Sequence, residues 1–214
     1  MGVASDIKNF FVGSGPQSIS GKRRLRRWDL VRRTFPDLAD MSVLDLGGTA
    51  ESWITSGLRP GRLVLLNPFE AGTVDGAQAV VGDACDPPEA VRRERFDLAF
   101  SNSVIEHVGG HAKRLGFAET ARTLADRVWV QTPYRYFPVE PHFVAPGFQF
   151  LPLALRARAL MAWPMATVET VEEAVARLQN VELLSRTEME AYFPDCRLVV
   201  EHFAGAPKSL IAVR

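Results

Sequence analysis

The sequence predicts an α/β protein built on a mostly parallel, doubly wound sheet. Five short apolar runs typical of β-strands recur between residues 42 and 133, and segments long enough to form crossover helices separate them. Crossovers of this kind join parallel strands and place helices on both faces of a sheet. The chain has 214 residues, of which 47% are hydrophobic, so it can bury one sizeable core. We therefore expect a single sheet-based domain.

The residues before the first strand divide into an arm and a helix. Residues 1–20 mix Gly, Ser and Pro with apolar residues without a clear period, which predicts a mobile arm. Apolar residues then recur at helical spacing while Lys and Arg fill the other faces, which predicts an amphipathic helix ending before Pro36. The apolar positions are Leu25, Trp28, Val31 and Phe35. The basic face is either a solvated surface or a patch for an anionic acceptor or a partner subunit.

The strands follow in order as SVLDLGG, RLVLLNPF, AQAVVGDA, RFDLAFSNS and DRVWVQTP. After Pro133 the pattern changes to a loop rich in proline and aromatic residues, and then to helical stretches near 153–162, 168–179 and 186–192. The last two runs, CRLVVEHFAG and KSLIAVR, are joined by the turn AGAP. This arrangement predicts an antiparallel hairpin at the edge of the sheet.

Charge and cysteine content exclude several classes of partner. The formal net charge is zero, so the molecule as a whole creates no field that attracts nucleic acid. Cys85 and Cys196 are far apart and show no spacing typical of a disulfide framework or a zinc site. The first residues lack a secretory pattern, and the most apolar window, residues 143–165, is interrupted by three prolines and two arginines. We expect a cytoplasmic protein without a membrane span.

The ends of the predicted strands are where a ligand site is expected, because open parallel sheets bind ligands outside the carboxyl ends of their strands. Asp45 is followed by Gly47 and Gly48, which allow a backbone turn to approach a ligand closely before a helix begins. The later strands end near further polar side chains. These are Asn67, Asp83, Ser101, Asn102, Glu106 and His107, of which Glu106 and His107 are expected to open the helix after the fourth strand.

Taken in order, these strand ends resemble the class I S-adenosylmethionine-dependent methyltransferases, and specifically the small-molecule branch whose fourth strand runs into a segment like FSNSVIEHVGG. The resemblance covers roughly residues 40–140. It implies a Rossmann-like, doubly wound seven-stranded sheet with a reversed last strand, and S-adenosylmethionine as cofactor with S-adenosylhomocysteine as product. It also implies one methyltransferase domain over residues 21–214 with a helical lid or insert at about 144–193, a region that can also serve as a homodimer face.

The resemblance assigns a role to each strand end. The glycine turn would hold the methionine part of the cofactor, Asn67 the ribose hydroxyls, and Asp83 the adenine amino group. The turn residues are Asp45, Gly47, Gly48 and Thr49, with Ala84 offering a backbone amide to adenine and Ser101 and Asn102 lining the site near the sulfonium. Two departures are that Thr49, Ala50 and Glu51 replace further glycines, and that Asn67 replaces the usual acid. A nicotinamide cofactor is disfavoured because the G-x-G-x-x-G pattern is missing.

The loop TPYRYFPVEPHF, residues 132–143, is the expected acceptor site. Its three prolines fix backbone angles, so the aromatic side chains between them lose little entropy on binding a sugar or other ring. His142, tuned by Glu140, is the candidate general base, with Tyr134 and Glu106 in supporting roles. The alternative is a histidine that merely pins the loop. No catalytic metal is predicted, because strands four and five end in SNS and QTP, which are poor in acid.

These features predict an O-methyltransferase that acts on a hydroxyl of a small molecule, with a saccharide as the expected acceptor. The chain is similar in this respect to the actinobacterial mannoside O-methyltransferases of methylmannose polysaccharide synthesis, and its excess of Arg over Lys fits a GC-rich bacterial genome. Two alternatives stay open. One is a non-catalytic module that keeps the fold and the cofactor pocket, and the other is a methyltransferase for a lipid-linked or anionic acceptor.

Overall fold

A computed structural model describes residues 19–70, 72, 76–163 and 168–214, with side chains from Leu25 onward. The chain divides into two compact units. The sheet unit comprises residues 36–137 and 181–214, and the helical unit comprises residues 138–180 together with the described residues up to Phe35. Helix α2 (Ile19–Thr34) begins inside the predicted arm, and residues 1–18 of that arm lie outside the described residues.

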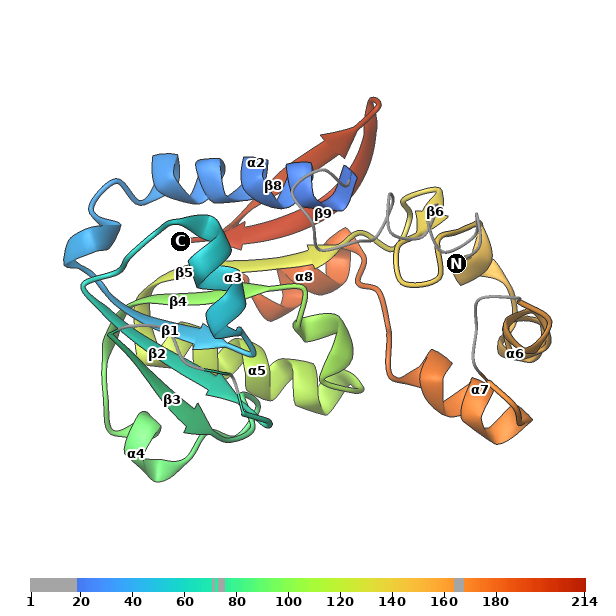
Figure 1. Ribbon diagram of the computed structural model, residues 1–214, viewed down its shortest axis with the longest axis horizontal. Helices are drawn as coiled ribbons and strands as arrows, with labels where there is room; N and C mark the ends of the chain where they lie inside the picture. Colours follow the sequence, from blue (N-terminus) through green and yellow to red (C-terminus); the bar gives the residue numbers. More distant parts are fainter. Residues whose placement is uncertain (1–18, 71, 73–75, 164–167) are drawn as a thin grey trace. The chain divides into compact units, whose positions relative to one another are not determined.

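The sheet unit contains a seven-stranded sheet in the order β3-β2-β1-β4-β5-β9-β8 (Figure 1). Its strands are β1 (Ser42–Leu46), β2 (Arg62–Asn67), β3 (Ala77–Val81), β4 (Phe96–Asn102), β5 (Ala125–Pro133), β8 (Arg197–Phe203) and β9 (Ala206–Val213). The first five pair in parallel. Strand β9 pairs antiparallel with both β5 and β8, so it is the one reversed strand of this sheet. The predicted parallel runs and the C-terminal hairpin are confirmed.

Helices cover both faces of this sheet (Figure 1). The helices of the unit are α3 (Ala50–Ser56), α4 (Glu89–Arg92), α5 (His111–Leu124) and α8 (Arg186–Tyr192), with short 3-10 turns η1 (Leu38–Asp40) and η2 (Ile105–His107). Helices α4, α5 and α8 share one buried core with alternate residues of β1, β2, β4, β5 and β9. On the other face, the ring of Trp53 from α3 lies 5.1 Å from that of Phe100 on β4. Strands β1 and β2 are buried on both faces, which fits their largely apolar sequences, and Asp45 is the one charged residue among the buried positions of these two strands.

The helical unit has a smaller core of its own. Beyond α2 it contains the hairpin strands β6 (Val139–Glu140) and β7 (Ala145–Pro146), the turn η3 (Phe148–Phe150), and helices α6 (Leu153–Met161) and α7 (Val171–Gln179). The core around η3, α6 and α7 consists of Ala145, Phe148, Ala157, Leu160, Ala174 and Leu178. The predicted apolar stripe of α2 is buried at Trp28 and Val31, whereas Leu25 is largely exposed.

Two boundaries differ from the sequence pattern. Helix α8 was expected within the insert of residues 144–193, yet Met189 and Tyr192 pack in the core of the sheet unit. Glu106 and His107 were expected to open a helix, but they form the 3-10 turn η2, and α5 begins only at His111. None of the described helices combines the length and the apolar character that crossing a bilayer requires.

Candidate functional site

In the turn after β1, Gly47 and Gly48 both lie so close to neighbouring side chains that a Cβ at either position would displace them. Gly47 has φ of +84°, and a Cβ there would lie 2.5 Å from Cγ1 of Val104. A Cβ on Gly48 would lie 1.7 Å from Oδ2 of Asp45, well inside van der Waals contact. The backbone of this turn therefore lies directly against the buried Asp45 carboxylate. A residue larger than glycine at position 48 would displace that carboxylate.

Asp45 is a buried acid with an incomplete set of hydrogen bonds. Its side chain lies under the turn, and Nε1 of Trp53 donates to Oδ2 at 2.6 Å. Oδ1 is buried and meets no hydrogen-bond donor among the described residues. Burial raises the pKa of Asp45 to about 7 from an ordinary value of 3.8, and hydrogen bonds from Trp53 and from the backbone of Gly48 offset this only in part. A ligand that carries a positive charge and binds beside Asp45 would stabilise the ionised form of this carboxyl group.

Asn67, the predicted ribose ligand at the end of β2, is engaged with the glycine turn. Its Nδ2 donates to the carbonyl oxygens of Gly47 and Gly48, each at 3.1 Å, and its Oδ1 accepts from the amide of Phe69 at 3.0 Å. An acid, which the resembled family usually has at this position, has no donor for the two carbonyls. The departure from the family pattern therefore has a structural reason, because an amide can hold both carbonyl groups of the turn.

Thr49 begins α3 but does not cap it with its side chain. The residue is exposed and extended, and its hydroxyl makes no cap hydrogen bond to the described helix. The hydroxyl is thus presented at the surface next to the turn that Asp45, Gly47 and Asn67 organise.

Asp83 and Ala84 follow β3, where the adenine contact was predicted. Asp83 accepts from the amide of Cys85 at 2.8 Å and from Nζ of Lys113 at 2.6 Å. Partial burial alone would raise the pKa of Asp83, but the hydrogen bonds from Lys113 and Cys85 outweigh it and hold the pKa below its usual value. Asp83 is therefore ionised at neutral pH and about half exposed, while Ala84 is buried.

Ser101 and Asn102 hold the end of β4 in place. The hydroxyl of Ser101 is fully buried and donates to the carbonyl oxygen of Leu46 at 2.8 Å, which ties β4 to the start of the glycine turn. Oδ1 of Asn102 accepts from Nε1 of Trp129 at 3.3 Å. The next residue, Ser103, has a left-handed φ of 54° and hydrogen-bonds to Gln131 at the end of β5. The predicted strand ends of β1, β2 and β4 are thus brought together by direct hydrogen bonds.

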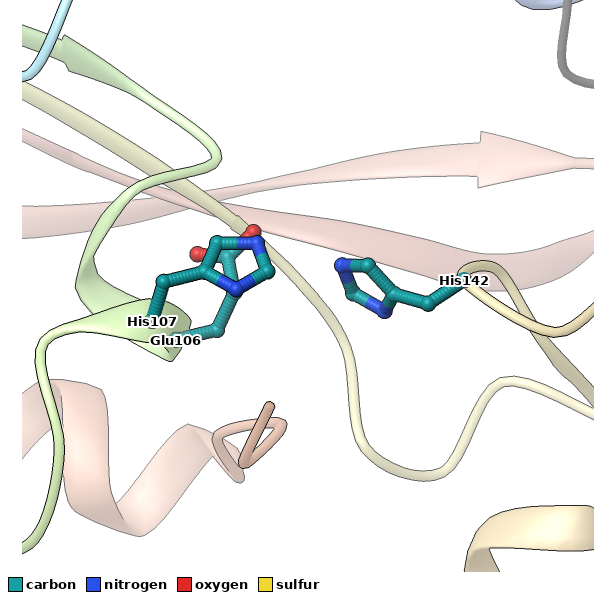
Figure 2. A group of neighbouring side chains, drawn as sticks. All are labelled: Glu106, His107 and His142. Carbon is teal, nitrogen blue, oxygen red and sulfur yellow. The ribbon is translucent and has the colours of Figure 1, made fainter. Parts of the chain in front are cut away.

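Glu106 and His107 lie on η2, just beyond these residues (Figure 2). Glu106 is buried, and the hydroxyl of Thr132 donates to its Oε2 at 3.0 Å. Its backbone carbonyl accepts from the amide of Glu182 at 2.9 Å, which attaches the segment before α8 to the same edge of the sheet. The Glu106 carboxylate therefore connects η2 to the end of β5.

The predicted pair of Glu140 and His142 forms within the helical unit (Figure 2 shows His142). Nδ1 of His142 lies 2.8 Å from Oε1 of Glu140. Oε2 of Glu140 accepts from the backbone amides of His142 and Phe143, at 2.7 and 2.6 Å. The Glu140 side chain is buried, so three hydrogen bonds fix both the carboxylate and the ring that it holds. This arrangement favours the imidazole tautomer with hydrogen on Nδ1 and the lone pair on Nε2.

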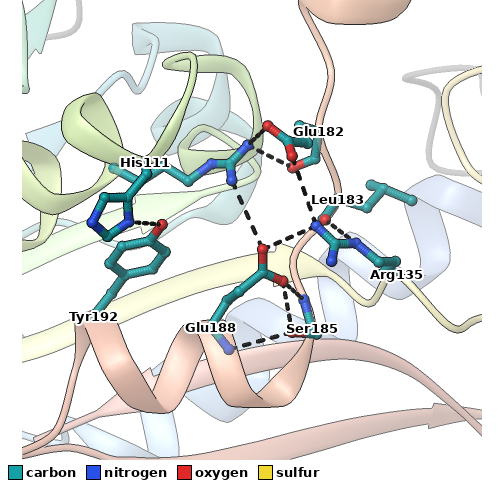
Figure 3. Close-up of polar contacts among 8 residues, drawn as sticks. His111, Arg135, Glu182, Leu183, Ser185, Glu188 and Tyr192 are labelled. Carbon is teal, nitrogen blue, oxygen red and sulfur yellow. Dashed lines mark hydrogen bonds and ion pairs between the residues drawn. The ribbon is translucent and has the colours of Figure 1, made fainter. Parts of the chain in front are cut away.

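Tyr134 and Arg135 connect the end of β5 to the segment before α8. Tyr134 forms an isolated parallel bridge with Leu184, and its ring meets that of Tyr136 edge-on at 5.5 Å. Nε of Arg135 donates to the carbonyl oxygen of Leu183 at 2.7 Å, and its terminal nitrogen donates to Glu188 at 3.0 Å (Figure 3).

The same network extends to α5, where the buried Arg114 pairs with Glu182. Nδ1 of His111 lies 2.9 Å from the hydroxyl of Tyr192 (Figure 3). The sequence did not indicate Arg114, Trp53 or Lys113 as site residues. Their positions in the sequence could have indicated Trp53 and Lys113, because each lies on the helix that follows a predicted ligand-binding segment.

No protein-family model and no curated protein matches the sequence. Solved structures do match. The N-terminal domain of EvdMO1, crystallised with S-adenosylhomocysteine and D-fucose, is 14% identical with a TM-score of 0.54, and the match covers 92% of this chain and 84% of that one. Magnesium protoporphyrin IX methyltransferase (ChlM) from Synechocystis PCC 6803, with bound S-adenosylmethionine, is 12% identical with a TM-score of 0.54, covering 99% and 91%.

A third structure, described as a putative Zn-dependent alcohol dehydrogenase from Rhodobacter sphaeroides, is 12% identical with a TM-score of 0.56, covering 88% and 87%. Identities this low establish a common fold and nothing about the reaction. The strand order, with β9 reversed between β5 and β8, is that of the class I methyltransferase fold. The predicted fold class is confirmed.

Proposed function

We propose that this chain is an S-adenosylmethionine-dependent O-methyltransferase of the cytoplasm that acts on a hydroxyl group of a small molecule, with a saccharide as the preferred acceptor class. The observation that carries the proposal is the buried Asp45 carboxylate beneath a turn that requires glycine, at the carboxyl end of β1. The structural neighbours crystallised with S-adenosylmethionine or S-adenosylhomocysteine add support from the fold.

The residues of the turn fit such a cofactor. The methionine part of S-adenosylmethionine carries an ammonium group, and Oδ1 of Asp45 lacks a donor among the described residues. A cation held at the turn favours the ionised form of a buried carboxylate. In this proposal Gly47, Gly48 and Thr49 hold the methionine part, while Asp83 and the amide of Ala84 hold adenine. Asn67 acts as a positioning residue that fixes the turn, and Ser101 and Asn102 fix the end of β4 beside it.

The Glu140 and His142 pair supplies a general base. When bound, the cofactor provides an electrophilic methyl group and leaves as S-adenosylhomocysteine. His142 accepts the acceptor hydroxyl proton at Nε2 as the new oxygen–carbon bond forms, and Glu140 stabilises the resulting imidazolium through Nδ1. A hydroxyl is too weakly acidic to ionise unaided at neutral pH, so this proton transfer is needed. Tyr134 has a supporting role at the end of β5.

The saccharide class is proposed from the aromatic residues of the loop, which offer flat apolar surfaces for a sugar ring. Tyr136 is half-exposed and lies edge-on to Tyr134. The neighbour EvdMO1 was crystallised with D-fucose. Within this class we propose acceptors like those of the mannoside O-methyltransferases. A lipid-linked acceptor is the second candidate, favoured by the exposed apolar residues of the helical unit.

Calorimetric titration tests the cofactor assignment. Wild-type protein should bind S-adenosylmethionine and S-adenosylhomocysteine and should not bind NAD, and Asp45→Asn should weaken binding of both ligands by tenfold or more, since it removes a charge-assisted contact of about 1.5–3 kcal/mol. The exposed Asp40→Asn variant serves as control, because it carries the same charge change on η1. If the protein binds NAD alone, or binds none of the three ligands, the methyltransferase assignment is rejected. The chain would then be a module with this fold and another function.

Transfer of a labelled methyl group to a panel of saccharides tests the base. His142→Ala should abolish turnover at neutral pH while cofactor binding stays intact, and His202→Ala, which removes an exposed histidine from β8, should retain full activity. Equal activity of His142→Ala and wild type would assign His142 to holding the loop, as in the alternative role considered from the sequence.

A further inference from the structure

Gln131, near the end of β5, has a buried amide group with an unused donor. The residue is 1% exposed, and its Oε1 accepts from the hydroxyl of Ser103 at 3.0 Å. Its Nε2 is buried and meets no hydrogen-bond acceptor among the described residues. Burying a donor in this way costs free energy, because the donor loses water and gains no partner. A ligand that supplies the missing acceptor would explain why the group is kept.

The pairing of the strands places Gln131 on the same face of the sheet as Asp45. Asp45 pairs with Phe100 on β4, and Phe100 pairs with Trp129 on β5. Paired residues of neighbouring strands point to one face, and so do residues two apart in one strand. Gln131 therefore shares the face of Asp45, two strands away and closer to the carboxyl ends of the strands.

The two unpaired atoms on this face are complementary. Within the described residues, Oδ1 of Asp45 is an acceptor without a donor, and Nε2 of Gln131 is a donor without an acceptor. An α-amino acid group carries the matching pair, since its ammonium group donates hydrogen bonds and its carboxylate accepts them. Neighbouring strands lie about 4.8 Å apart, so β1 and β5 are separated by a distance that an amino acid group and its two hydrogen bonds can span.

The region between these two side chains can be reached from solvent. The intervening strand β4 ends at Asn102, which is only half-buried. Ser103, whose hydroxyl contacts Gln131, is exposed and has a left-handed φ of 54°. Such a φ is strained in a residue other than glycine, and strained residues are frequent at ligand sites. A small movement of Ser103 would open the Gln131 amide to a ligand at the end of β4.

We propose that Nε2 of Gln131 binds the α-carboxylate in the methionine part of S-adenosylmethionine, while Asp45 binds the ammonium group. This assignment rests on the proposed function, and it adds a residue of β5 to the site around Gly47 and Gly48. A carboxylate suits the buried donor better than the neutral hydroxyl of an acceptor does, because hydrogen bonds to an ionised partner are roughly twice as strong. The site would therefore recognise both charged groups of the amino acid.

Calorimetric titration with two ligands tests the contact. One ligand is S-adenosylhomocysteine, and the other is its decarboxylated analogue, an adenosyl thioether that ends in an aminopropyl group. Wild-type protein should bind S-adenosylhomocysteine at least tenfold more tightly, since the analogue leaves the buried donor unpaired. Gln131→Met should lower this preference by about tenfold, because methionine has a similar length but no donor.

Further variants distinguish ligand binding from a structural role. At pH 8, Gln131→Glu should bind the decarboxylated analogue more tightly than S-adenosylhomocysteine, because a second carboxylate repels the carboxylate of the ligand and attracts its amine. A residue that only holds β5 in place would not reverse the preference. Gln78→Met makes the same change as Gln131→Met at an exposed position of β3 and should keep the wild-type preference. Urea denaturation should show that Gln131→Met is at least as stable as wild type, since it removes an unpaired buried donor.

The results separate this inference from the proposed function. If wild-type protein binds neither ligand, both are rejected. If it binds S-adenosylhomocysteine and Gln131→Met keeps the wild-type preference, the cofactor assignment stands and the role of Gln131 is overturned. Equal affinity of wild-type protein for the two ligands would also overturn it, and that result depends on no variant. Unchanged cofactor affinity in Gln131→Met together with a raised KM for the acceptor would assign the amide to the acceptor instead.

Discussion

At the scale of single residues, Asp45 makes stability depend on pH. Its folded-state pKa of about 7 lies above the ordinary 3.8, so its contribution to stability is fully present below about pH 3.8 and is lost as the pH rises through 7. Asp45→Asn keeps an acceptor for Trp53 and removes the buried charge. We expect it to raise the free energy of unfolding of the cofactor-free protein at pH 8, by roughly 4 kcal/mol at most, with much less effect at pH 5.

Urea denaturation of both proteins at pH 5 and pH 8 measures this difference. An equal change at the two pH values would show that the effect comes from packing rather than from ionisation. The same substitution is expected to weaken cofactor binding. A variant that is more stable but binds the cofactor less tightly would show that Asp45 serves ligand binding at a cost in stability.

Asn67 gives a second prediction at the same scale. Asn67→Asp introduces an acid, as is usual at this position in the resembled family, but replaces two donors with an acceptor that faces the carbonyl oxygens of Gly47 and Gly48. We expect the free energy of unfolding to fall by about 1–3 kcal/mol, together with weaker cofactor binding. Thermal denaturation and calorimetric titration check the two effects. Tighter cofactor binding would instead mean that residue 67 contacts the ribose directly.

These residues mark how far the sequence could predict the site. The order of Asp45, Gly47 and Gly48 after an apolar run was sufficient to locate the turn. The partner of Asn67 was not predictable, because it depends on which way two carbonyl groups point once the turn has formed. Trp53 was missed for a similar reason, since a tryptophan on a helix normally indicates core packing and not a donor to a buried acid.

At the scale of secondary-structure elements, the start of α8 is held by a reciprocal cap. Ser185 accepts from the amide of Glu188, and the Glu188 carboxylate accepts from the amide and hydroxyl of Ser185. Ser185→Ala should lower the free energy of unfolding by about 0.5–2 kcal/mol. Thr49→Ala is the matched control, since Thr49 occupies the N-cap of α3 without a cap hydrogen bond and its loss should change little. Chemical denaturation of the two variants compares them, and equal losses would contradict the assignment.

The period of the apolar residues was sufficient to predict which segments form helices and which form strands. It could not predict which of the two units a given helix belongs to. The helical pattern of residues 186–192 looks the same whether the helix covers an insert or a sheet. It is the burial of Met189 and Tyr192 against strand residues that places α8 in the sheet unit. The predicted insert of residues 144–193 therefore overlaps both units.

At the scale of the whole molecule, the two units differ in the size of their cores. The core around α6 and α7 contains six buried residues, whereas the core on one face of the sheet contains 22. Because stability follows buried apolar area, amides of α6 and α7 should exchange with deuterium through smaller opening free energies than those of β4 and β5. Thr170→Ala, which removes the N-cap of α7, should accelerate exchange in α7 and leave the strands unchanged. Identical protection throughout would show one cooperative unit.

Residues 138–180 leave the sheet unit and return to it at two neighbouring points, and this arrangement has a consequence for evolution. Residues 138–180 depart after β5 and return before α8, and the two crossing points are held together by the bridge between Tyr134 and Leu184 and by hydrogen bonds from Arg135. Since both ends of the excursion are already adjacent, closing them with a different segment carries little entropic cost. Recombination can thus exchange the whole segment for another, while the turn around Gly47 and Gly48 in the sheet unit is inherited unchanged.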